Sequence, residues 1–94
     1  MSRLSHRSYE ILDALYIGKW MTGQDILADA PAVPEGTLYT TLLRLEQDGF
    51  VELQWVEKAS RRGRRGRRYR VTGKGQKAVE AERAAARIMQ GVIA

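Results

Sequence analysis

The hydrophobic positions of the chain change their spacing twice, from helical to alternating and then back to helical. In residues 5–17 the apolar side chains of Ile11, Leu12 and Leu15 fall on one face of a helix. Gly18 follows them and can adopt the left-handed backbone that often ends a helix. The first stretch therefore predicts an amphipathic helix with one buried face.

Two further helices are predicted before residue 50. Thr22 is a suitable N-cap for a short helix over residues 23–30, and the prolines that follow interrupt it. A third helix is predicted over residues 35–48, with Pro34 at its start and Gly49 at its end. Its inward face is formed by leucines at positions i, i+4 and i+7: Leu38, Leu42 and Leu45.

The period then becomes two, which is typical of strands with one buried face. In residues 50–56, Val51, Leu53 and Trp55 alternate with polar side chains, and Tyr69 and Val71 do the same in residues 67–72. The connection between these strands, about residues 57–66, is longer than a tight turn, so we expect a long β-hairpin with a mobile tip.

Helical spacing returns after Thr72, which can cap a last helix that runs towards Gln90. Its apolar positions recur at three- and four-residue intervals, as in a helix-pairing seam. The seam consists of Ala78, Ala81, Ala85, Ile88 and Val92, and Met89 lies beside it. Three helices, a hairpin and a last helix predict a mainly α fold with a small β-hairpin (α+β), the winged helix-turn-helix.

Charge is distributed unevenly along the 94 residues, which carry a formal net charge of +5. The segment from Lys58 to Arg70 holds eight basic residues and no acidic one, whereas the remainder is net acidic. A positive potential focused in one stretch favours a polyanionic partner. The chain has no cysteine, no apolar run long enough to span a bilayer and no signal-peptide pattern, so a cytoplasmic protein without membrane contact is expected.

Three blocks of sequence resemble the PadR family of bacterial transcriptional regulators. They are "MTGQDIL", "PEGTLYTTLLRLEQDGFVE" and "RRYRVTGKG", within a resemblance that runs from about Ile11 to Val79. The middle block is the most specific, because it reproduces the family's recognition-helix pattern. The resemblance implies a dimeric DNA-binding repressor, with a DNA-binding domain in residues 1–72 (wing about 50–72) and a C-terminal helix for dimerisation in residues 73–94.

The chain departs from that family at several points. The family usually has tyrosine at the position of Gln24 and proline at the position of Thr40, so contacts of the second helix and of the groove are altered. Members also usually carry a longer C-terminal region. Here only one helix follows the wing, so the dimer contacts and any effector pocket must be built from less material.

The third helix is the candidate for the major groove, where base edges distinguish all four base pairs. Threonine hydroxyls and an arginine can read such edges, and a tyrosine hydroxyl can hold a phosphate. The residues predicted to do so are Thr37, Tyr39, Thr40, Thr41 and Arg44. Contacts with the DNA backbone are predicted for the start of the second helix, at Thr22 and Gln24.

The arginine-rich stretch lies between two strands and not at a terminus, which favours a wing over a tail. Arginines at a hairpin tip suit a narrow minor groove, and those on the returning strand suit phosphates. The predicted tip contacts are Arg61, Arg62, Arg64 and Arg65, the predicted strand contacts are Arg67, Arg68 and Arg70, and Lys58 is a further predicted contact of the wing.

A two-fold dimer predicts a palindromic operator with half-sites about 34–36 Å apart. The predicted interface combines the last helix with the first: Leu4, Ile11, Ala78, Ala81, Ala85, Ile88, Met89 and Val92. Trp20 and Trp55 are interpreted as packing surface; a site for a small aromatic or hydrophobic effector, as the family's inducers suggest, is the alternative.

No enzyme, metal site or cofactor is predicted. His6 is the only histidine, and no phosphate-cradling glycine loop stands between a strand and a helix. Two other functions stay open on the sequence: non-specific binding of RNA or DNA through the basic stretch, and a winged-helix module that docks an acidic protein partner.

Overall fold

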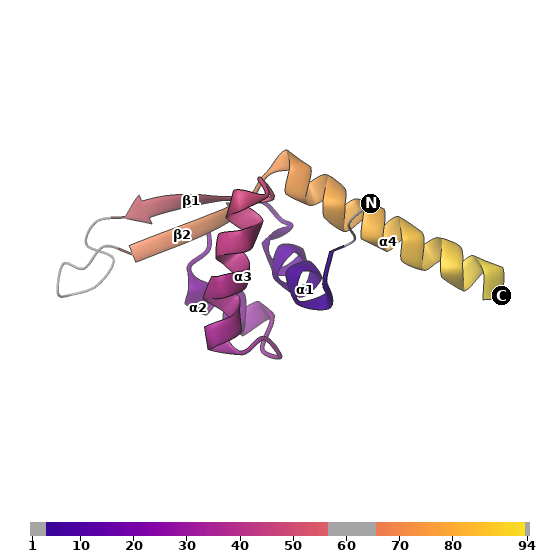
Figure 1. The fold of residues 1–94 in the computed structure, drawn as a ribbon, viewed down its shortest axis with the longest axis horizontal. Helices are drawn as coiled ribbons and strands as arrows, with labels where there is room; N and C mark the ends of the chain where they lie inside the picture. The colour runs from indigo at the N-terminus through magenta and orange to yellow at the C-terminus, as the bar shows by residue number, and fades with distance from the viewer. Residues whose placement is uncertain (1–3, 57–65, 94) are drawn as a thin grey trace.

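The structure, a computed structural model, describes residues 4–56 and 66–93, the last four by their backbone alone. Four helices and one antiparallel hairpin follow each other in the predicted order (Figure 1). The elements are α1 (His6–Leu15), α2 (Gly23–Asp29), α3 (Glu35–Gln47), β1 (Val51–Val56), β2 (Gly66–Val71) and α4 (Gly73–Ile93). The mainly α winged helix-turn-helix fold predicted from the spacing is confirmed.

Local signals in the sequence place the helix ends. As predicted, Thr22 caps α2: its hydroxyl accepts a hydrogen bond from the N–H of Asp25 (3.1 Å). The Asp25 carboxylate in turn accepts a hydrogen bond from the N–H of Thr22 (3.0 Å), which completes a capping box. Thr72 caps α4 by accepting the N–H of Gly75 (3.1 Å). Gly18 and Gly49 have φ angles of +87° and +82°, the left-handed conformation that glycine adopts without strain.

The core forms where α1, α2, α3 and the first part of α4 meet the base of the hairpin. The predicted inward residues of the first and third helices are buried. The largest fully buried side chains of the described chain are Ile11, Leu12, Leu15, Ile26, Leu38, Leu42, Leu45 and Val79. Ile11 was expected at a dimer interface, but 0% of its surface is exposed in the protomer. That prediction is corrected: Ile11 belongs to the core, because its face of α1 packs inward.

The hairpin pairs Val51 with Val71 at its base and Val56 with Gly66 at its outer end. A third segment joins it: Met21 and Tyr69 exchange two backbone hydrogen bonds of 2.8 Å each. This one-residue bridge was not predicted, since a single paired residue leaves no alternating pattern. It ties the segment before α2 to the middle of β2.

Burial decreases along the hairpin away from the body. Val51 and Tyr69 are buried, Leu53 is half-buried, and Trp55 is 52% exposed although it follows the same alternation. The reason is visible in Figure 1, where the two strands extend beyond α2 and α3 and their outer ends have less protein beneath them.

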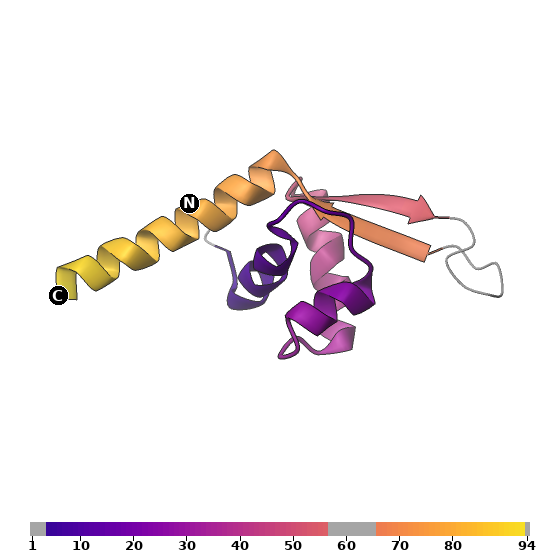
Figure 2. The ribbon, with the colours of Figure 1, turned by 180° about the vertical axis from the view of Figure 1, so that it is seen from behind.

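Helix α4 leaves the body on the side opposite to the hairpin (Figures 1 and 2). Its first turn lies so close to the end of α3 that a Cβ at Gly75 would overlap the backbone oxygen of Phe50. Farther along, Ile88 and Met89 are 68% and 65% exposed. Among the described residues no helix is long and apolar enough to cross a membrane.

Candidate nucleic-acid interface

The outward face of α3 is polar because its inward positions are taken by the core leucines. Thr40 and Arg44 are exposed, and Thr37 and Thr41 are half-buried beside them. The Thr40 hydroxyl donates to the backbone oxygen of Gly36 (3.2 Å), one turn earlier, so its oxygen can still accept a hydrogen bond. The predicted recognition residues therefore share one surface of one helix.

Arg44 lies in the last turn of α3, where the negative end of the helix dipole favours a cation. Within the part of the chain that the structure describes, its guanidinium makes no ion pair. A planar group with five donors is thus held at the surface without an internal acceptor, which is what bidentate recognition of guanine requires.

Tyr39 lies on the flank of α3 and is half-buried. Its hydroxyl occupies the space next to the first residue of α2, since a Cβ at Gly23 would overlap it. The guanidinium carbon of Arg67 lies 5.0 Å from the centre of the Tyr39 ring. The structure thus places this tyrosine between α2 and the wing, where sequence reasoning had given it only a phosphate contact.

The three predicted contact arginines of β2 have different surroundings. Arg68 is exposed, and its positive charge helps to lower the pKa of Asp25 in α2. Arg70 instead donates two hydrogen bonds to Oε1 of Glu52 (3.0 and 2.7 Å) and lies 4.5 Å from the centre of the Trp20 ring. Arg70 therefore has two partners within the protomer, and its phosphate contact stays a prediction.

The remaining predicted wing residues, Lys58, Arg61, Arg62, Arg64 and Arg65, lie outside the described residues. They stay a prediction. The described ends of the two strands, Val56 and Gly66, pair with each other at the end of the hairpin that lies away from α4 (Figure 1).

Asp25 lies beside the predicted DNA-backbone contacts at the start of α2, and no role for it there was predicted from the sequence. Hydrogen bonds from the Thr22 backbone and hydroxyl lower the pKa of Asp25, and Lys19 and Arg68 act in the same direction. Thr22 serves as the N-cap, and Gln24 beside it is exposed. A phosphate approaching Gln24 would thus meet a carboxylate whose charge Lys19 and Arg68 partly compensate.

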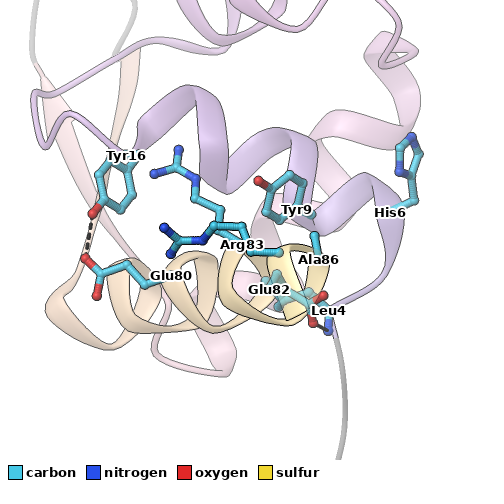
Figure 3. A pocket seen from close by; sticks show the side chains of 9 residues that line it. Leu4, His6, Tyr9, Tyr16, Glu80, Glu82, Arg83 and Ala86 are labelled. Carbon is cyan, nitrogen blue, oxygen red and sulfur yellow. Dashed lines mark hydrogen bonds between the residues drawn. The ribbon is translucent and has the colours of Figure 1, made fainter. Parts of the chain in front are cut away.

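A groove of about 1010 Å³ runs between α1 and α4 (Figure 3). Polar contacts hold the helices together along it; among them, the Tyr16 hydroxyl donates to Glu80 (2.5 Å), and Arg83 pairs with Asp13 (2.6 Å). Arg83 also lies 4.4 Å from the centre of the Tyr16 ring. The hydrogen bond to Glu80 raises the pKa of Tyr16, so the phenol stays protonated.

The predicted interface residues lie along this groove and beyond it. Leu4 lines the groove, Ala78 and Ala85 are half-buried, and Ala81 is exposed. The side chain of Val92 lies outside the described residues. Neither tryptophan lines the groove: Trp20 stacks on Arg70, and Trp55 belongs to the hairpin.

The described residues 4–56 and 66–93 were expected to hold no metal site. No group of three or more His, Asp or Glu residues there could hold a metal ion. His6 is exposed and faces Glu10 of its own helix at 3.2 Å.

Three helices with a hairpin after the third and a polar outer face on that helix define a winged helix-turn-helix protein. Comparison with known proteins gives the family. The chain belongs to the transcriptional regulator PadR-like family, whose model matches residues 9–81. This family consists of transcriptional regulators and not enzymes, in agreement with the prediction.

Solved structures resemble the chain over most of its length. A PadR-like transcription factor from Bacteroides fragilis has 31% identity and a TM-score of 0.79, covering 93% of this chain and 85% of that one. A PadR family transcription regulator from hypervirulent Clostridium difficile R20291 has 22% identity and the same TM-score, with 95% of both chains covered.

Bacillus subtilis PadR in complex with operator DNA has 19% identity and a TM-score of 0.71, covering 82% of this chain and 47% of that one. At this identity the likeness concerns the fold alone. None of the curated proteins compared with the chain is similar enough in sequence to count as a match.

Proposed function

We propose that the protein is a homodimeric repressor that binds a palindromic double-stranded DNA operator. Helix α3 enters the major groove, and the arginine-rich wing lies at the minor groove or along the phosphate backbone. Since its target is genomic DNA, the protein acts in the cytoplasm. The observation that carries the proposal is the outward face of α3, where Thr40 and Arg44 stand opposite the core leucines and on the same molecule as a basic wing.

The geometry supports reading of bases by α3. A recognition helix needs a rigid base, and Leu38, Leu42 and Leu45 anchor α3 in the core over its whole length. Its exposed side then presents hydroxyl, methyl and guanidinium groups, which together can address adenine, thymine and guanine edges. The fold of an operator-bound PadR protein is also that of this chain.

The dimer is supported by the outer part of α4. Ile88 and Met89 are large apolar side chains with most of their surface exposed, on a helix that extends beyond the body (Figure 2). A second copy related by a two-fold axis would cover both and the groove beside α1, because the same surface on each protomer then meets itself. Leu4, Ala81 and Ala85 complete this proposed interface.

Binding should be measured to a random duplex, to the best duplex recovered from a random pool, and to a structured RNA, each at two salt concentrations. A repressor prefers one duplex sequence at both salt concentrations. Equal affinity for all duplexes would favour non-specific binding through the arginine stretch, and a preference for the RNA would favour an RNA-binding protein.

A further inference from the structure

Arg67 occupies a different environment from the other described arginines of the hairpin. Its guanidinium carbon lies 5.0 Å from the centre of the Tyr39 ring and 5.8 Å from the centre of the Trp55 ring. Tyr39 belongs to α3, whereas Trp55 and Arg67 are directly opposite each other on β1 and β2. One side chain thus joins both strands of the wing to the recognition helix.

The position of Tyr39 is itself fixed from the other side. Gly23, at the start of α2, has no Cβ, and the Tyr39 hydroxyl fills the place that a Cβ would need. A small cleft of about 260 Å³ is lined by residues of α2, α3 and β2, among them Gly23, Tyr39 and Arg67. The three elements predicted to contact DNA therefore converge at this point.

Burial along the hairpin ends close to the body. The outermost buried residue is Val51 on β1 and Tyr69 on β2, and more than half of the surface of Trp55 is exposed. A guanidinium close to the faces of two aromatic rings is attracted to both, and its planar shape suits stacking better than an ammonium does. Arg67 thus links the outer hairpin to α3.

We propose that Arg67 is a positioning residue that couples the wing to the recognition helix, and that it contributes to sequence specificity without neutralising a phosphate. This inference rests on the proposed function and revises the phosphate contact predicted for Arg67 from the sequence. When the wing is held at a fixed angle to α3, both elements bind the same duplex together. The affinity for the preferred duplex then includes the contacts of both elements.

The neighbouring Arg68 provides a matched control. It has the same charge, lies one residue away on the same strand, and is exposed on the other face of the hairpin. If Arg68 contacts a phosphate, its loss weakens binding to every duplex alike. It also makes the log–log salt dependence shallower by about 0.9.

The experiment compares the full-length wild type with Arg67→Ala, Arg67→Lys and Arg68→Ala. Dissociation constants are measured for the best duplex recovered from a random pool and for a random duplex, over a series of salt concentrations. Arg67→Ala is expected to lower the ratio of the two affinities roughly fivefold or more, with an unchanged salt slope. Arg67→Lys, which keeps the charge but stacks poorly, is expected to lower the ratio as well.

A Tyr39→Leu background tests the coupling itself. If Arg67 acts through the Tyr39 ring, Arg67→Ala in that background lowers the ratio by less than it does alone. Tryptophan fluorescence in a Trp20→Phe background, where only Trp55 reports, should change on Arg67→Ala and not on Arg68→Ala.

The proposal is overturned if Arg67→Ala behaves as Arg68→Ala, with a shallower salt slope and an unchanged ratio, because Arg67 is then a phosphate contact. Full rescue by Arg67→Lys would overturn it too, since charge alone would suffice. A wild type without any duplex preference would defeat the proposed function and this inference with it, and that result is seen before any variant is made.

Discussion

Arg44 presents its guanidinium at the exposed end of α3, with the helix dipole behind it and no ion pair within the described chain. An arginine in this setting can donate two hydrogen bonds to a guanine, whereas Arg70 already donates two to Glu52. We therefore assign base reading by arginine to Arg44 first.

Arg44→Ala should weaken binding to the selected duplex by about 1–3 kcal/mol and relax the preference at one base position of each half-site. The measurement is binding to the selected duplex and to its single-base variants. An unchanged preference at every position would remove Arg44 from the recognition set, and Gln47→Ala, an exposed substitution on the same helix, serves as the control.

Asp25 links stability to pH through its capping role. Hydrogen bonds from Thr22 lower its pKa in the folded state, so its contribution to stability is present above the ordinary pKa of about 3.9. That contribution is lost as the pH falls through the lowered pKa. The stability difference between wild type and Asp25→Asn should hence be largest near neutral pH and shrink below about pH 4.

Urea denaturation of both proteins at a series of pH values measures this difference. A difference that stays constant down to pH 2 would show that the Asp25 carboxylate contributes nothing specific to the cap.

At the scale of elements, the junction of β2 and α4 is set by how closely two backbones approach. Gly75 lies against the backbone oxygen of Phe50, whereas Gly73, two residues earlier, has open space around the position of a Cβ. The same substitution at these two glycines should have opposite consequences.

Gly75→Ala should reduce the free energy of unfolding by about 1–3 kcal/mol, because a methyl group cannot fit against a backbone atom without moving α4. Gly73→Ala should leave the free energy of unfolding unchanged or raise it by about 0.4–1 kcal/mol, because alanine lowers the conformational entropy of the unfolded chain. Chemical denaturation of both variants decides this; equal effects would contradict the close packing of this junction.

Much of the order and extent of the elements could be predicted, because helical and alternating periods and capping residues are local signals. Thr22, Thr72, Gly18 and Gly49 each mark an element end within a few residues of it. The Met21 bridge could not be predicted, because it depends on a tertiary contact between residues 21 and 69.

The candidate site was predictable in residue type but not in role. Sequence places Arg67, Arg68 and Arg70 in one basic strand and gives them one function. The structure separates them through partners from elsewhere in the chain: Tyr39 for the first and Glu52 for the last. Such partners have no fixed spacing in the sequence, so no local pattern predicts them.

At the scale of the molecule, the hairpin and α4 extend from opposite sides of the helical body (Figure 1). The proposed DNA contacts and the proposed dimer contacts are therefore separate surfaces. A substitution in one should leave the other intact, which makes the two parts of the function separable by experiment.

Ile88→Lys should convert the protein to a monomer at micromolar concentration and abolish cooperative binding to paired half-sites, because a charge would be buried in the interface. Ile17→Lys is the matched control: Ile17 is exposed to the same degree, but it lies outside α4. Sedimentation of the two variants and the wild type checks this, and two equally dimeric variants would place the interface elsewhere.

The central claim is that this chain reads DNA sequence as a two-fold dimer through α3. Selection of bound duplexes from a random pool tests it most directly, since one measurement reports both specificity and half-site spacing. For a two-fold dimer we expect an inverted repeat with half-site centres about one helical turn, or 34–36 Å, apart. A recovered pool without sequence preference, or with a single unpaired site, would contradict it.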